Sequence, residues 1–596
     1  MAKGLKNQIY EDFAKGLNLF TRDILLKENE SSVALNVWAT GKNSICKRPG
    51  IVKLATIAGA TKIDGLGTYY AGATRELIAM AGGVAYKVQT GTAVALSAAP
   101  ASANVFTTEK RTDMCQAGGK LFFANGTEPI RVYDGTAIRP QTGAITAKYL
   151  IFYKGCLWAA GSPTAGDESR LFRSGTDVNI GNFTYQVNKI GTATATTANK
   201  LTDSAGAFTT ANVTVGMNVT NTTTGTVAKI TGIDSTTQLA IDKDIFLNTN
   251  GYSIANNPMA TSVYVSQSDG QYLNGFFKHQ DYLYPVKERS LWRTSVGTDA
   301  YGLITSEMID PSRGCDSHFS IDSVDNDNFM FSENGVYATG YEPNILDQIR
   351  TNIVSLRVDP KIKNIEKSRL DDVCGVYYDN HYYLSFTSGG GGYNDTILVY
   401  DRQRLGWWEF QYALGASFGG ANCFSEFKDS TGQTRLYFGS SVDGSIYYFD
   451  PILKQDAGYV INTEWKSGAM SFGDLQQEKF ILDVSLLFGK QACNPTINIY
   501  VDGELAGTKT ISIGNTGSAG IGIGMIGVEK IGVGSGSLSI ADQGGGQWVR
   551  IPIGRIGRNV SVEILDADTT GTKTWEMSAI SVNFKALNNL FQKNLL

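Results

Sequence analysis

The chain is poor in charged residues and in proline. Only 18% of its 596 residues are Asp, Glu, Lys or Arg, and only 13 are Pro. Long surface helices are rich in Glu, Lys, Leu and Ala, so this composition disfavours a largely helical fold. Gly (67 residues), Tyr (28) and Phe (27) are plentiful instead. Aromatic residues favour pleated strands and Gly favours the turns between them, so we expect an all-β fold.

The length and the charge set two further limits. A single hydrophobic core does not extend over 596 residues, so we expect roughly two to four domains. The formal net charge is −4. A protein that grips DNA neutralises phosphates with clustered Lys and Arg, so the charge argues against tight nucleic-acid binding. It is compatible with a surface that DNA slides past without sticking.

Cysteine and histidine occur without the spacing of a metal site or a disulfide framework. No Cys-x-x-Cys pair exists, which predicts buried free thiols made in a reducing compartment. None of the three histidines has a second His or a Cys at ligand spacing, so we expect no metal and no cofactor. These residues are Cys46, Cys115, Cys156, Cys315, Cys374, Cys423 and Cys493, and His279, His318 and His381.

Long apolar runs are also missing. No window holds 18 consecutive apolar residues, and the first residues do not resemble a signal peptide. We therefore expect a protein that is made in the cytoplasm and does not span a membrane.

A loose internal repeat is the most informative feature that is present. Each unit consists of an apolar strand, a short polar turn, a second apolar strand and then a third. Seven such units begin near Leu77, Met114, Tyr149, Leu273, Phe319, Cys374 and Asn422. Their spacing, roughly 35 to 55 residues once an insertion is excised, is typical of the blades of a β-propeller. A string of small β-sandwiches is the rival architecture, and the units are too short for it.

The turns of these units have residues that tolerate a positive φ. Gly118 and Gly119, Lys154 and Gly155, and Asp379 and Asn380 stand between paired apolar runs, as does Gln280 followed by Asp281. Two-residue hairpin turns require such residues, so we expect a hairpin at each position.

The composition divides the chain into five segments. We predict a β-propeller of about seven blades with an inserted small β-domain and a C-terminal β-sandwich that contains a Gly-rich loop. The boundaries are an N-terminal arm and entry strand (1–60), the first part of the propeller (61–187), the inserted domain (188–262), the second part of the propeller (263–455) and the sandwich (456–596). One helix is predicted over 344–354, where Ile345, Ile349 and Ile353 recur every four residues.

Motifs that carry chemistry are scarce. No Gly-x-Ser-x-Gly elbow is present, and the run Gly389 to Gly392 is not followed by Lys and Ser or Thr. The acidic stretch Asp322 to Asp327 lacks the Gly and Glu of an EF-hand and is interpreted as a hairpin turn. Trp407 and Trp408 are expected to wedge blades together, although a glycan platform is the alternative. Paired carboxylates that hydrolyse sugars converge only in space, so the sequence leaves that reaction open.

The N-terminal segment resembles the opening of many phage tail proteins. Three stretches carry the likeness: Gly16-Leu-Asn-Leu-Phe-Thr-Arg-Asp23, the run from Glu28 to Asn36, and Ile45-Cys-Lys-Arg-Pro-Gly50. The stretch from Asp395 to Trp407 and the segment from Thr202 to Tyr252 are similar to such proteins as well.

This resemblance implies a hub or nozzle protein of a short-tailed bacteriophage, without enzymatic activity. Such a protein forms a ring, usually of six copies, in the tail of the virion. Its neighbours are adaptor and portal-side proteins and tail fibre or needle proteins, and genomic DNA passes through its lumen without specific binding. The C-terminal segment has no counterpart in the resemblance.

The same resemblance gives the candidate interface residues. They are Arg22, Asp23, Lys47, Arg48, Pro49 and Gly50. The last four are interpreted as a stiff turn that leads into the first blade, and a basic contact to DNA or to an acidic neighbour is the alternative. Residues 1–30 are expected to order only against a partner. Two other functions remain open: a glycan-binding or depolymerase propeller, and a scaffold for protein partners.

Overall fold

The computed structural model describes residues 5–41, 43–184, 187–211, 213–255, 260–267, 269–296, 304–341, 349–414, 417–429, 432–489, 494–511, 547–566 and 574–587. Nearly all regular structure in these ranges is β-strand, and the α-helix α1 (Asp359–Lys363) is five residues long. The predicted all-β class is confirmed. Among the described residues, no helix has the length and apolar character needed to cross a membrane.

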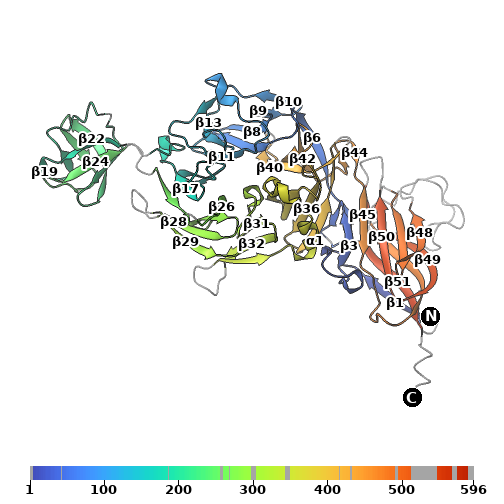
Figure 1. Ribbon diagram of the computed structural model, residues 1–596. Helices are drawn as coiled ribbons and strands as arrows, with labels where there is room; N and C mark the ends of the chain where they lie inside the picture. The colour runs from blue at the N-terminus through green and yellow to red at the C-terminus, as the bar shows by residue number, and fades with distance from the viewer. Residues whose placement is uncertain are drawn as a thin grey trace, which may run out of the picture.

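Antiparallel sets of four strands follow one another along the chain, five as separate sheets and two as parts of larger sheets (Figure 1). Five of them take their strands in chain order: β7 to β10 (65–95), β11 to β14 (113–140), β26 to β29 (273–310), β30 to β33 (322–353) and β34 to β37 (374–410). In two others the fourth strand is supplied from elsewhere. β25 (Thr261–Tyr264) completes β15 to β17 (149–173), and β6 (Gly50–Thr56) completes β40 to β42 (421–450).

The first strands of these sheets surround a common axis. β7 (Gly65–Ala71) packs against β11 (Asp113–Ala117), which packs against β15 (Tyr149–Tyr153), and β15 packs against β26 (Leu273–His279). The 3-10 turn η4 (His318–Ser320) bridges β26 and β34 (Cys374–Tyr378). β34 then contacts β40 (Ala421–Lys428), and β40 contacts β7. Each of the seven repeated segments identified in the sequence contributes strands to a different one of these sheets.

Strands in the middle of a sheet are apolar because neighbouring sheets cover both of their faces. β36 (Thr396–Asp401) is buried at every position, and so is β37 (Gly406–Phe410). The turns between strands follow the sequence. Lys154, Gly155, Asp379 and Asn380 all have a positive φ, so the hairpin turns predicted there are confirmed.

The segment between β17 (Arg170–Arg173) and β25 folds separately. Its strands β18 to β24 (187–255) form one seven-stranded sheet, which projects away from the other sheets in Figure 1. Leu201, Val219 and Tyr252 are among its core residues, and that core contains only residues from this segment.

The C-terminal strands form two sheets that include N-terminal strands. One sheet joins β46 (Lys479–Phe488), β49 (Gln547–Gly557) and β51 (Glu576–Ala586) to β4 (Val37–Ala39) and β5 (Ile45–Lys47). The other runs without a break from β34 through β37, β2 (Gly16–Leu17) and β3 (Glu30–Leu35) to β45 (Thr463–Ser467), β50 (Val560–Asp566), β47 (Thr496–Val501) and β48 (Glu504–Thr510). Hydrogen bonding therefore continues across the position at which the sequence suggested a separate C-terminal unit.

Two predictions are wrong, one about the N-terminal arm and one about the helix over 344–354. Residues 5–30 are ordered by the chain itself: β1 (Leu5–Tyr10) pairs through its backbone with β51, and β3 pairs with β45. Where a helix was expected, β33 (Ile349–Ile353) pairs with β32 (Gly335–Tyr341). A spacing of four is even, so it also satisfies the two-residue period of a strand. Residues 344–348 and the Gly-rich loop 513–546 lie outside the described residues.

Candidate functional sites

Arg48 forms the centre of a buried joint. Its guanidinium donates to both carboxylate oxygens of Asp456, at 2.9 and 2.6 Å, and to Asn36 Oδ1 at 2.8 Å. The charge lies 4.1 Å from the ring centroid of Tyr412. Arg48 is fully buried. Burial works against its charged form, but the ion pair with Asp456 outweighs burial and raises the pKa of Arg48.

The residues next to Arg48 belong to the same joint. Lys47 is fully buried and its Nζ lies 3.3 Å from Asp566 Oδ2. The Pro49 carbonyl accepts a bond from Arg48, and the Gly50 amide donates to the Leu453 carbonyl at 2.7 Å. The alternative of a surface contact from Lys47 or Arg48 to DNA or a neighbour is wrong. Both cations pair with carboxylates of their own chain, which lowers the cost of burying them.

Arg22 and Asp23 are placed differently. Both are exposed, at the start of the 3-10 turn η1 (Asp23–Leu25). Phe20 and Leu25 beside them are 60% and 58% exposed. Arg22 and Asp23 therefore stay candidate interface residues, and they lie apart from the buried joint.

One end of the common axis is crossed by Arg111. This residue precedes β11, yet its Nη1 donates to the Asp372 carbonyl at 2.7 Å and its Nη2 donates to the Asn422 carbonyl. Its guanidinium lies 4.4 Å from the ring centroid of Phe319. Arg111 thus connects the second sheet to the strands that begin the sixth and seventh.

The segment Asp371 to Val373, which precedes β34, is held by side chains of two other sheets and of its own. Lys148, which precedes β15, lies 3.1 Å from the Asp371 carboxylate. Ser317 Oγ donates to the Val373 carbonyl at 2.6 Å, and Asn394 Nδ2 donates to the Asp372 carbonyl at 2.8 Å. Together with Arg111, these side chains form a polar network across the axis. We call this set of residues the axial network.

Two carboxyl groups lie near the axial network, Asp64 buried and Asp113 partly exposed. Asp64, which precedes β7, is 2% exposed, and burial raises its pKa to about 6. Asp113 accepts the Leu150 amide at 2.7 Å and lies 3.5 Å from His318 Nε2. A buried carboxyl with a raised pKa is a candidate general acid, but a group shielded to this degree does not reach a substrate.

The remaining polar candidates have structural partners. His279 Nδ1 lies 3.0 Å from Asn328 Nδ2, and His381 Nδ1 lies 2.6 Å from the Asp379 carbonyl. In the part of the chain that the structure describes, no group of three or more His, Cys, Asp or Glu is placed to hold a metal. Six cysteines are free there, and Cys493 lies outside it.

The acidic stretch Asp322 to Asp327 forms a hairpin turn, and Trp407 and Trp408 pack inside the protein, as the sequence analysis expected. Arg402 lies 3.5 Å from Asp325 and 3.0 Å from Asp327, so a guanidinium neutralises the turn. Asp325 has a φ of 54°, as a hairpin turn requires. Trp407 and Trp408 are fully buried, so neither offers a face to a glycan.

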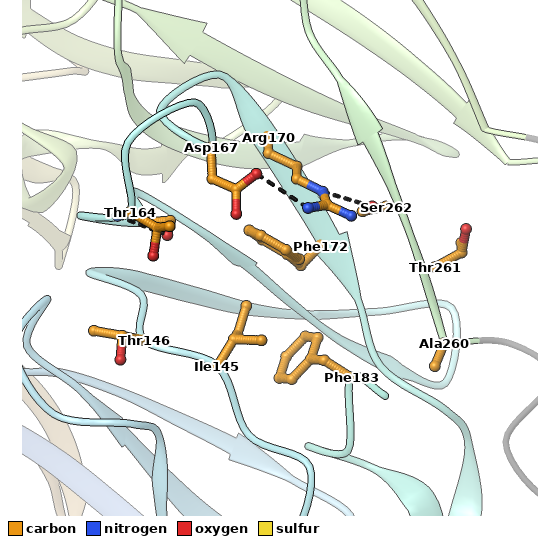
Figure 2. Close-up of a pocket in the computed structure, with 11 residues that line it drawn as sticks. Ile145, Thr146, Thr164, Asp167, Arg170, Phe172, Phe183, Ala260, Thr261 and Ser262 are labelled. Carbon is orange, nitrogen blue, oxygen red and sulfur yellow. Dashed lines mark hydrogen bonds and ion pairs between the residues drawn. The ribbon is translucent and has the colours of Figure 1, made fainter. Parts of the chain in front are cut away.

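A pocket of about 790 Å³ lies beside the root of the inserted sheet (Figure 2). Phe172 and Phe183 line it, with Arg170 held at 3.0 Å from Asp167 Oδ1. The rest of the lining consists mostly of short hydroxylated side chains: Thr146, Ser162, Thr164, Thr261 and Ser262. No sequence motif marked this pocket, because its residues come from four separate stretches and are of common types.

Comparison with known proteins gives matches only among solved structures. No family model and no curated protein matches the chain. Similar solved structures include the extracellular domain of a putative one-component system from B. thetaiotaomicron, with 11% identity and a TM-score of 0.23 over 68% of this chain and 52% of that chain. An exo-β-1,3-galactanase from Phanerochaete chrysosporium has 7% identity and a TM-score of 0.20 over 90% and 100%. The phage phi92 endosialidase has 10% identity and a TM-score of 0.17 over 91% and 70%. At these TM-scores the likeness carries no argument about function.

Proposed function

We propose that the chain is a non-enzymatic structural subunit of the tail of a short-tailed bacteriophage. In this proposal it is a seven-bladed β-propeller with an inserted β-domain and a C-terminal β-sandwich. Copies of the chain, six by the resemblance of its N-terminal segment, form a ring through which the genome is retained and ejected.

The axial network is the observation that supports the proposal. Arg111 and Lys148 tie the second and third sheets to the segment Asp371 to Val373, which precedes the sixth, so side chains bridge the sheets of one chain at this end. The interior of such a disc is a packed element and not a duct. DNA then has to pass between copies, along the centre of a ring, and each chain supplies a sector of the wall.

The continuity of the sheets supports a load-carrying role. The ten-stranded sheet and the buried pair of Arg48 with Asp456 join the axial sheets to the C-terminal strands. A wall that resists the pressure of packaged DNA needs such rigid joints. The exposed Arg22, Asp23, Phe20 and Leu25 are the proposed contacts to the next copy or to an adaptor, portal-side, fibre or needle protein.

A glycan-active propeller is the second candidate. A depolymerase requires a pair of carboxyl groups that touch the substrate. Asp64 is shielded at the axis, and Trp407 and Trp408 are buried, so these residues do not favour hydrolysis. Binding of a glycan without hydrolysis requires only a pocket, and the pocket in Figure 2 is the observation that favours it.

Immunogold electron microscopy tests the proposal. Antibodies against the purified chain are applied to virions of the phage that encodes it, with antibodies against the major capsid protein as the control. We expect label on the tail at the vertex that carries the portal. Label on the capsid faces, or a chain that never enters the particle, would overturn the proposal.

A further inference from the structure

The pocket beside the inserted sheet has the size and lining of a ligand site. Its volume, about 790 Å³, lies within the range of small-molecule sites, roughly 300 to 1,000 Å³. We infer that this pocket binds a short neutral oligosaccharide. The inference goes beyond the ring-forming role and does not rest on it.

The apolar part of the lining comes from aromatic rings. Phe172 lies on β17, and Phe183 follows β17 along the chain. The two side chains are 8% and 9% exposed, and Ile145 lies beside them (Figure 2). Only the edges of these rings are open, since the Arg170 guanidinium lies 4.8 Å from the Phe172 ring centroid, and these edges with Ile145 give the pocket an apolar part for the C–H groups of a sugar. Rings without hydroxyls at the floor disfavour a fully polar ion as the ligand.

The charged part of the lining is balanced. Arg170 donates to Asp167 at 3.0 Å through Nη1 and to Ser262 Oγ at 2.8 Å through Nε. Tyr264 donates to the same Asp167 oxygen at 3.2 Å. One positive and one negative side chain therefore face the pocket as a pair. A strongly charged ligand would break this pair and leave one charge uncompensated, which disfavours nucleotides and acidic sugars.

The pair still has bonding capacity toward a ligand. Among the described residues, Arg170 Nη2 and Asp167 Oδ2 take no part in these bonds. A planar guanidinium edge and a carboxylate oxygen are suited to adjacent hydroxyls of one sugar.

Hydroxyl side chains complete the match. Thr146, Thr164 and Thr261 line the pocket from three different stretches. Each hydroxyl both donates and accepts, as each sugar hydroxyl does, so such a rim bonds a neutral saccharide without demanding a charge. A peptide would instead require a row of backbone donors or acceptors, and the lining offers mainly side-chain hydroxyls.

Isothermal titration and saturation-transfer NMR on the full chain test the inference. The probes are three neutral trisaccharides, maltotriose, mannotriose and β-1,4-galactotriose, with an α-2,8-linked sialic acid trimer as the acidic comparison. We expect at least one neutral trisaccharide to bind, with a Kd on the order of 1 mM, and to bind more tightly than the acidic trimer.

Two variants place the binding in this pocket. Thr164→Trp fills the pocket from an exposed position, and we expect at least a tenfold loss of affinity. Thr92→Trp introduces the same side chain at an exposed position on β10 (Thr92–Ala95) and should leave affinity unchanged. Three results would overturn the inference: no neutral trisaccharide binds at 10-fold the stated Kd, the acidic trimer binds best, or Thr164→Trp binds as the unmodified chain does. None of them bears on where the chain lies in the virion.

Discussion

At the scale of single residues, Arg48 is a fully buried charge that depends on its ion pair with Asp456. It satisfies Asp456 with two bonds in a site without water access. We expect Arg48→Met to lower the free energy of unfolding by about 3 to 5 kcal/mol, because Asp456 is left buried without its partner. Differential scanning calorimetry measures the change as a lower midpoint of the transition.

The control for Arg48 is an exposed ion pair. Arg289 is paired with Glu288 at 3.5 Å, and its side chain is 76% exposed. Arg289→Met should change the free energy of unfolding by less than about 1 kcal/mol. If Arg48→Met is no more destabilising than Arg289→Met, the joint does not hold the two parts of the chain together.

Asp64 gives a prediction about pH. Burial raises its pKa to about 6, above the value of about 3.9 in an unfolded chain. The folded state therefore binds this proton more tightly, so the stabilisation is present at pH 4 and is lost as the pH rises through 6. The loss amounts to about 2 to 3 kcal/mol for this one group.

Asp64→Asn isolates this contribution. Asn stays neutral at every pH, so the variant should gain stability relative to the unmodified chain between pH 4 and pH 7. The unfolding midpoint of both proteins is measured across that interval. If the difference between the two midpoints does not change with pH, the pKa of Asp64 is not raised in the folded chain, and the prediction is wrong.

At the scale of elements, the hairpins could be predicted from sequence and the sheet partners could not. Turn residues such as Lys154 and Gly155 determine a local hairpin, because their positive φ is a property of the two residues themselves. The pairing of β6 with β42 (Ser445–Asp450) depends on segments that lie about 390 residues apart in the chain, and nothing in either segment names the other. The helix predicted around Ile349 failed because its apolar spacing fits both periods.

Gly50, the first residue of β6, gives a prediction about the stability of the chain. A Cβ at Gly50 would meet the backbone of Gln455, which lies directly against it. We expect Gly50→Ala to destabilise the chain by roughly 1 to 3 kcal/mol, because backbone has to move to make room. Gly41→Ala is the matched control, since no atom lies within 4 Å of its Cβ position. Equal unfolding midpoints for the two variants would argue against the close approach of β6 to the strand pair 455–460.

The candidate sites also divide into those that the sequence marked and those that only the fold brings together. The stretch from Lys47 to Gly50 stood out in the sequence, and the structure explains it as a buried joint of the chain itself. The axial network and the pocket carried no signal, because Arg111, Lys148, Asp167 and Arg170 are ordinary polar residues until the sheets bring them together. Chemistry that arises from residues of separate sheets requires the fold before it can be recognised.

At the scale of the whole molecule, the proposal separates two axes. One passes through the centre of the sheets of a single chain and is crossed by the axial network. The other is the centre of the proposed ring, which lies outside any one chain. The described residues include several exposed apolar side chains on the N-terminal segment, among them Phe20, Ile24 and Leu25, and the proposal assigns these to the contacts between copies.

Single-particle electron cryomicroscopy of the virion tail, with the chain at its natural copy number, tests this account most directly. The account predicts a ring of identical subunits around a central channel, with the seven sheets of each subunit closed around an axis that contains side-chain density from Arg111 and Lys148. Subunits that lie singly in the tail without a shared channel would contradict it. So would DNA density that runs through the sheets of one subunit.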